Sequence, residues 1–88
     1  MYSSDALASI YQIRARIYLN MKEYRKAIEE YTEGIKIYKV YKIYSYRTHL
    51  IDFYRGRSRC YRALGDVGMA ELNEEYAKRA ELGWTHIE

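Results

Sequence analysis

The 88-residue chain contains no proline and only one cysteine. Without proline, no residue has the fixed φ angle and missing backbone N–H that kink or stop a helix. A single cysteine, Cys60, excludes a disulfide within the chain. No apolar run approaches the ~20 residues of a membrane-spanning helix, and residues 1–10 lack the basic start and long apolar run of a secretory signal. We therefore expect a protein of the reducing cytoplasm that has no membrane partner.

Large aromatic residues other than tyrosine are also scarce. Phenylalanine and tryptophan occur once each, whereas tyrosine occurs twelve times. A tyrosine buries its ring while its hydroxyl stays near the surface, so we expect a core built largely from tyrosine rings. The length of the chain predicts one small domain over residues 1–88.

The net charge of +3 is distributed unevenly along the chain. Residues 1–35 have five basic and five acidic side chains. Residues 36–62 have eight basic side chains and one acidic side chain, a net charge of +7. Residues 63–88 have two basic and six acidic side chains, a net charge of −4. The basic middle would attract an acidic partner, or the acidic segment of another copy.

Apolar residues recur at steps of three and four along most of the chain, which places them on one face of a helix. This spacing predicts four helices, over about 5–20, 23–45, 48–64 and 67–82. The apolar face of the first helix includes Ile17 and Met21. Ser3 is a suitable cap for the start of the first helix and Asp66 for the start of the fourth, and Gly83 is suited to end the fourth.

The connection between the second and third helices has two interpretations. Residues 39–46, KVYKIYSY, have alternating bulky side chains as a strand would, but nothing else in the chain would pair with such a strand. We therefore interpret them as a continuation of the second helix that breaks near 45–48. Because residues 39–50 contain no glycine or proline, the second and third helices could instead fuse into one rod. Fusion would produce a domain-swapped dimer.

One phrase occurs twice, as YQIRARIY at 11–18 and as YRGRSRCY at 54–61. When residues 11–38 are aligned with residues 54–81, small side chains meet small ones and tyrosines meet tyrosines. The equivalent pairs are Tyr11 and Tyr54, Arg14 and Arg57, Ala15 and Ser58, Arg16 and Arg59, Tyr18 and Tyr61, Ala27 and Ala70, and Gly34 and Ala77. Such a pattern is typical of helix–turn–helix units that stack on their own copies.

The first unit resembles a tetratricopeptide repeat (TPR), whose motif alternates large and small residues along two antiparallel helices. The matching residues are Tyr11, Ala15, Tyr18, Tyr24, Ala27, Tyr31 and Gly34. The second unit matches through Tyr54, Ser58, Tyr61, Leu64-Gly65-Asp66, Ala70 and Ala77. The resemblance implies an all-α fold, a TPR-like α-solenoid of about four antiparallel helices. Unit one would span about 5–44 and unit two about 46–83.

The chain departs from the family in several places. Its two units are offset by 43 residues, whereas the usual period is about 34, so we expect lengthened second and third helices. The usual proline after the second helix is missing. Val67 stands where an aromatic residue is usual, and Glu74 where a large apolar residue is usual.

The resemblance also implies where a partner would bind, because in this family the first helix of each unit lines a concave groove. The implied partner-binding residues are Gln12, Arg16, Asn20, Arg55, Arg59 and Arg62. Some relatives hold a peptide's carboxylates with a clamp that includes an asparagine, but Ile13 and Gly56 stand at those positions here. A more general groove for an acidic peptide remains, since the arginine fork suits carboxylates.

The arginines have a second interpretation. Arg55, Arg59 and Arg62 share one helix face, where like charges repel by a few tenths of a kcal/mol per pair. Either that face binds anions, or it is a solvated basic face that acidic residues of the fourth helix neutralise. Those acidic residues are Glu71, Glu74 and Glu75. Arg14 and Arg57 lie on the tyrosine side of their helices, and we expect both to stack on tyrosine rings.

No catalytic or metal-binding pattern accompanies these features. His49, His86 and Cys60 are not at metal-ligand spacing, and no nucleophile–base pair has a supporting context. We therefore expect no enzyme activity, metal or cofactor. The leading hypothesis is a protein–protein interaction module that binds an acidic peptide or partner. The alternatives are a self-associating scaffold, since two repeats leave apolar ends, and, less favoured, a nucleic-acid-binding protein.

Overall fold

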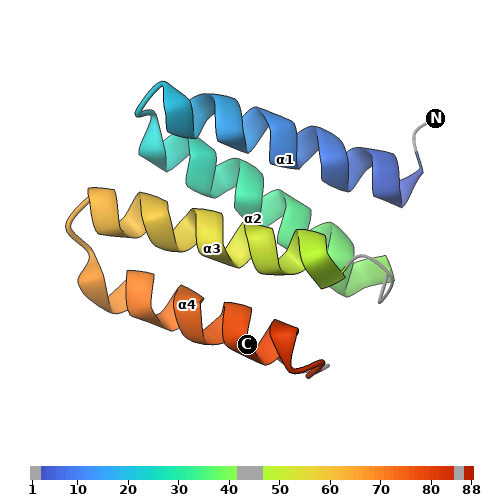
Figure 1. Cartoon of the computed structure of the whole chain (residues 1–88). Helices are drawn as coiled ribbons and strands as arrows, with labels where there is room; N and C mark the ends of the chain where they lie inside the picture. The colour runs from blue at the N-terminus through green and yellow to red at the C-terminus, as the bar shows by residue number, and fades with distance from the viewer. Residues whose placement is uncertain (1–2, 42–46, 85–86) are drawn as a thin grey trace.

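Four α-helices follow one another along the chain and pack as two antiparallel pairs (Figure 1). The computed structural model describes residues 3–41, 47–84 and 87–88. The helices are α1 (Ser4–Asn20), α2 (Tyr24–Tyr41), α3 (Arg47–Ala63) and α4 (Val67–Glu81). Every regular element in the described residues is a helix, so the predicted all-α fold of helical hairpins is confirmed.

The α2–α3 connection was predicted either to continue the second helix or to fuse both helices. Its residues 42–46 lie outside the described residues, so the continuation beyond Tyr41 is not described. In this chain α2 and α3 are separate helices that lie side by side and run in opposite directions (Figure 1). The domain-swapped dimer, in which α2 and α3 would form one continuous helix, therefore stays a prediction.

The two hairpins close with the same turn, which supports the repeat seen in the sequence. In the first, the backbone N–H of Glu23 donates to the carbonyl of Tyr18 at 2.8 Å. In the second, Asp66 donates to Tyr61 in the same way at 2.8 Å. Each turn needs one residue with a positive φ angle, which is Gly65 (83°) in the second hairpin and Lys22 (62°) in the first. This is the usual geometry of a helix that ends in a left-handed residue.

The core combines small residues at the helix crossings with a few large rings. Six alanines are buried among the described residues, at positions 8, 15, 27, 70, 77 and 80. Phe53 and Tyr54 on α3 are fully buried, and Tyr31 on α2 is nearly so. Most other tyrosines are only half-buried, so the predicted tyrosine core is correct for two rings and the remaining tyrosines line its edges.

The predicted inward face of α1 is partly wrong. Ile17 and Met21 have exposed fractions of 52% and 62%, and Ala15 is the residue that α1 buries at its centre. The reason is that α1 packs mainly on α2 and α3, so one side of it has no neighbouring helix in the described part of the chain (Figure 1). The spacing of apolar residues alone does not distinguish a helix face that packs within the chain from one that is exposed.

The cap of α4 gives the first testable prediction. The side chain of Asp66 accepts a hydrogen bond from the backbone N–H of Met69 at 3.1 Å. The substitution Asp66→Ala removes this bond and should lower the free energy of unfolding by about 1 kcal/mol, measured by urea denaturation. Asp66→Ser retains an acceptor and should recover most of the loss. Equal stability of the alanine variant and the unchanged protein would contradict the assignment.

None of the helices in the described part of the chain combines the length and the apolar character needed to cross a membrane.

Candidate functional site

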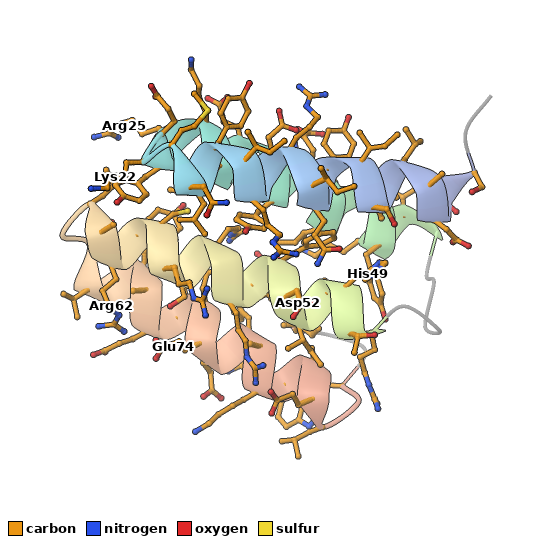
Figure 2. All side chains as sticks on the ribbon, turned by 45° about the horizontal axis from the view of Figure 1, so that its top comes forward. Lys22, Arg25, His49, Asp52, Arg62 and Glu74 are labelled. Atoms are coloured by element: carbon orange, nitrogen blue, oxygen red, sulfur yellow. The ribbon has the colours of Figure 1, made fainter. Side chains whose placement is uncertain are left out.

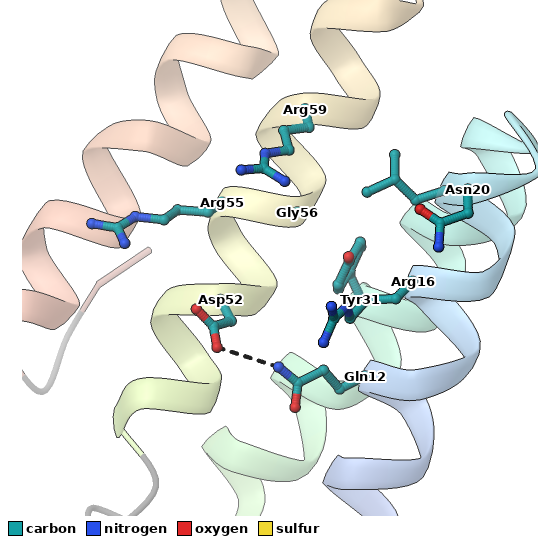
Figure 3. A pocket seen from close by; sticks show the side chains of 9 residues that line it. Gln12, Arg16, Asn20, Tyr31, Asp52, Arg55, Gly56 and Arg59 are labelled. Atoms are coloured by element: carbon teal, nitrogen blue, oxygen red, sulfur yellow. Dashed lines mark hydrogen bonds between the residues drawn. The ribbon is translucent and has the colours of Figure 1, made fainter.

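A hollow of about 360 Å³ lies between α1 and α3, with α2 behind it (Figure 3). Five of the six predicted partner-binding residues line it: Gln12, Arg16, Asn20, Arg55 and Arg59. The sequence prediction missed the other residues of the lining, which are Leu19, Tyr31, Asp52 and Gly56. The implied groove between the first helices of the two units is therefore present as a hollow.

Tyr31 and Gly56 together form the floor of the hollow. The Tyr31 ring is only 3% exposed and packs against Phe53, with ring centroids 6.1 Å apart. A Cβ atom added at Gly56 would lie 2.2 Å from Cζ of Tyr31. The absence of a side chain at Gly56 is therefore what allows the Tyr31 ring to reach between the helices. Gly56 is also a position of the family's asparagine clamp, and here a tyrosine from α2 fills that space.

Two arginines face each other across this floor. Arg16 comes from α1 and Arg59 from α3, and both side chains are exposed. Within the part of the chain that the structure describes, neither guanidinium has a hydrogen-bond or ion-pair partner. Burial raises the pKa of the Tyr31 hydroxyl, and the positive charges of Arg16 and Arg59 partly offset this increase. Two unpaired guanidiniums close to one hydroxyl form a suitable site for a carboxylate.

Asp52 and Arg55 limit the positive charge of the hollow. Asp52 accepts a hydrogen bond from Nε2 of Gln12 at 3.3 Å, which joins α3 to α1 across the hollow (Figure 3). The guanidinium of Arg55 points toward α4 and pairs with Glu81 (Figure 3). The hollow therefore has a net formal charge of +2, and Arg16 and Arg59 are the cations free to bind a ligand.

The structure places Arg62 outside the hollow. Its guanidinium pairs with Glu74 of α4 at 2.9 Å (Figure 2). At 100° per residue, Arg59 lies about 40° round the α3 axis from Arg55, on the α1 side, whereas Arg62 lies about 20° the other way. Arg62 was predicted to line the groove, but this angular difference turns its side chain toward α4. The other interpretation, in which an acidic residue of α4 neutralises the arginine, is correct for Arg62.

Glu74 is the acid that performs this neutralisation. It also accepts a hydrogen bond from the Ser58 hydroxyl at 3.2 Å. The hydrogen bonds from Arg62 and Ser58 lower the pKa of the Glu74 carboxyl below its usual value. Glu75 pairs within its own helix, with Arg79 at 3.5 Å. The departure of Glu74 from the family pattern thus has a structural role, because its carboxylate fixes α4 to α3.

Three buried groups that can lose a proton, two tyrosine hydroxyls and one thiol, predict instability at high pH. Burial raises the pKa of the Tyr31 hydroxyl and of the Tyr54 hydroxyl above 10.0, and it raises the pKa of the Cys60 thiol to about 11. Unfolding returns each group to its ordinary pKa, about 8.5 for cysteine and about 10 for tyrosine. The unfolded chain then binds fewer protons than the folded chain, so stability falls as pH rises.

We therefore expect the free energy of unfolding to decrease from about pH 9 upward, measured by urea denaturation at a series of pH values. The Tyr31→Phe variant should show a shallower decrease, because one of the three titrating groups is gone. A pH dependence that is identical in the variant and the unchanged protein would contradict the burial of the Tyr31 hydroxyl.

Among the residues that the structure describes, no three side chains of histidine, cysteine, aspartate or glutamate gather where they would hold a metal ion. No family model, characterised protein or solved structure matches this chain.

Proposed function

We propose that this protein is a non-catalytic interaction module that binds an acidic segment of a partner protein in the hollow between α1 and α3. The observation that carries the proposal is the pair formed by Arg16 and Arg59. Both are exposed, both lack a partner among the described residues, and both act on the buried Tyr31. Guanidiniums bind carboxylates through charge-assisted, often bidentate hydrogen bonds.

We also propose that the two hairpins are TPR-like units and that the protein works in the cytoplasm. The matching turns at Lys22 and Gly65, 43 residues apart, support the first statement. The second rests on the single cysteine, Cys60, which is free and buried.

A titration with a short fluorescent peptide rich in glutamate, followed by anisotropy, tests the proposed function. We expect saturable binding that weakens as salt is added, because the contacts are charged. A peptide of the same length with glutamine in place of glutamate should not bind. A single-stranded oligonucleotide provides the comparison with nucleic acid. If the oligonucleotide binds and the glutamate peptide does not, the proposal is wrong and nucleic-acid binding replaces it.

Self-association is the second candidate function, and one observation favours it. Ile13, Ile17 and Met21 form a stripe along the open side of α1, with exposed fractions of 58%, 52% and 62%. Residues four apart lie on the same helix face, so the stripe is continuous, as expected of a surface that another helix covers. Light scattering over a wide concentration range tests this. A dimer that the Ile17→Glu substitution dissociates would support self-association, and a monomer at every concentration would exclude it.

A further inference from the structure

Arg57 lies on the opposite side of α3 from the hollow, and its environment differs from that of Arg59. Its exposed fraction is 7%, and its guanidinium stacks on the Tyr54 ring at 5.6 Å. Within the described residues, Nε of Arg57 is buried and has no hydrogen-bond partner. A buried cation is costly unless a negative charge compensates it. A carboxylate placed near Arg57 would therefore lower the cost of burying it.

The first repeat shows how such an arginine is normally neutralised in this chain. Arg14, the equivalent of Arg57, pairs with Glu30 of its own hairpin at 2.9 Å and lies over the Tyr11 ring at 5.9 Å. The stacking predicted for both arginines is thus confirmed. The repeat offset places Asn73 where the first unit has Glu30.

Asn73 cannot replace the carboxylate of Glu30. It is fully buried and donates to the backbone carbonyl of Met69 at 2.8 Å, and its own Oδ1 has no partner among the described residues. A neutral amide compensates no charge. The second repeat therefore has the arginine and the stacked tyrosine of the first but no acid at the position equivalent to Glu30.

Glu88, which follows α4 in the chain, brings a carboxylate to the hydroxyl of the Tyr54 ring on which Arg57 stacks, and its charge interacts with that of Arg57. Its Oε2 accepts a hydrogen bond from the Tyr54 hydroxyl at 2.6 Å and forms an ion pair with Nζ of Lys39 at 2.8 Å. Burial raises the pKa of Glu88, but the bonds from Lys39 and Tyr54, together with the charge of Arg57, lower it more, so the net shift is downward. Glu88 is thus held as a carboxylate by groups from α2 and α3.

Arg79 of α4 contacts the described residues on either side of positions 85–86. Ile87 is 8% exposed, and its backbone carbonyl accepts a hydrogen bond from Nη1 of Arg79 at 2.8 Å. Arg79 also lies over the rings of Tyr76 and Trp84, at 5.8 and 5.6 Å. Among the described residues 84, 87 and 88, the contacts to the helices include the Trp84 ring, the Ile87 side chain and carbonyl, and the Glu88 carboxylate. A short peptide with the same groups reproduces all four.

We propose that Lys39, Tyr54 and Arg57 form a second binding site, for an extended peptide in which an aliphatic residue is followed by glutamate. Ile87 and Glu88 occupy this site from within the chain and compete with such a peptide on a partner protein. An attached segment has a high effective concentration, in the millimolar range for short flexible links. The site is therefore closed to the partner until Ile87 and Glu88 are displaced. It is separate from the hollow between α1 and α3.

The test uses the full chain and a labelled peptide with the sequence of residues 83–88, GWTHIE, with both ends blocked so that its only carboxylate is the glutamate side chain. The double substitution Ile87→Ser and Glu88→Gln empties the site. We expect the peptide to bind this opened chain at least tenfold more tightly than the unchanged chain, because the internal competitor is gone. A peptide that ends in glutamine should lose this binding.

Two further variants of the opened chain locate the binding. Lys39→Gln changes a half-exposed side chain and should weaken peptide binding several-fold without affecting the fold. Arg25→Gln, an exposed residue near the turn between α1 and α2 that lines neither site, should leave binding unchanged. The inference is overturned if the opened and unchanged chains bind the peptide equally, if the glutamine peptide binds as well as the glutamate peptide, or if Arg25→Gln weakens binding as much as Lys39→Gln.

Discussion

The substitution Gly56→Ala should destabilise the protein by about 1–3 kcal/mol, the usual cost of an extra group in a packed interior. In an ordinary helix interior the same change would stabilise by roughly 0.5–1 kcal/mol, because glycine is the more flexible residue. Here the new Cβ would lie 2.2 Å from Cζ and 2.5 Å from Cε2 of Tyr31. The ring is 3% exposed and packs against Phe53, so either the ring or the helices must shift.

Gly68→Ala is the matched control for this prediction. Gly68 lies in α4, and the nearest atom to its added Cβ is Oδ1 of Asp66, at 3.9 Å. This variant should gain up to about 1 kcal/mol of stability. Urea denaturation of both variants measures the two changes. Stability changes of the same sign at Gly56 and Gly68 would contradict the close packing of Tyr31 on α3.

The double substitution Arg16→Gln and Arg59→Gln should weaken binding of the glutamate-rich peptide at least tenfold. A hydrogen bond to a charged group contributes about 1.5–3 kcal/mol, and about 1.4 kcal/mol corresponds to a factor of ten in affinity. Both side chains are exposed, and neither has a hydrogen-bond or ion-pair partner among the described residues. The fold should therefore be retained, and the circular dichroism spectrum should be unchanged.

Lys22→Gln with Arg25→Gln provides a control with the same change in net charge. Both residues are exposed near the turn between α1 and α2 (Figure 2), and neither lines the hollow. This variant should lose little affinity, because general electrostatic attraction is weak at physiological salt. Equal losses of peptide affinity in the two double variants would mean that binding depends only on the overall charge and that the hollow has no special role.

The features that the sequence predicts well are those that depend on neighbouring residues. Helix spacing, the cap at Asp66 and the repeated turns are local, and all are present in the structure. The offset of 43 residues also brings Arg16 and Arg59 together correctly, because equivalent positions on stacked hairpins face the same side. Repeats thus convert a local pattern into a three-dimensional prediction.

The features that the sequence does not predict depend on what packs against each helix. Ile17 has core spacing but lies on the open side of α1. Arg62 shares a face with Arg55 and Arg59, but its small angular offset directs it to Glu74. The contact of Glu88 with Tyr54 joins residues 34 apart, and no periodic pattern in the sequence predicts it. In the sequence, the sign of this is Asn73, which stands where the first repeat has Glu30, so that Arg57 lacks the ion pair that Arg14 makes.

NMR chemical shifts of the isotope-labelled protein can map where the glutamate-rich peptide binds. If the hollow between α1 and α3 holds its carboxylates, we expect the largest shifts at the backbone amides of Arg16, Gly56 and Arg59, and we expect them to saturate with a single affinity. Largest shifts on the open side of α1, at Ile13 and Ile17, with small ones at Gly56, would contradict binding in the hollow.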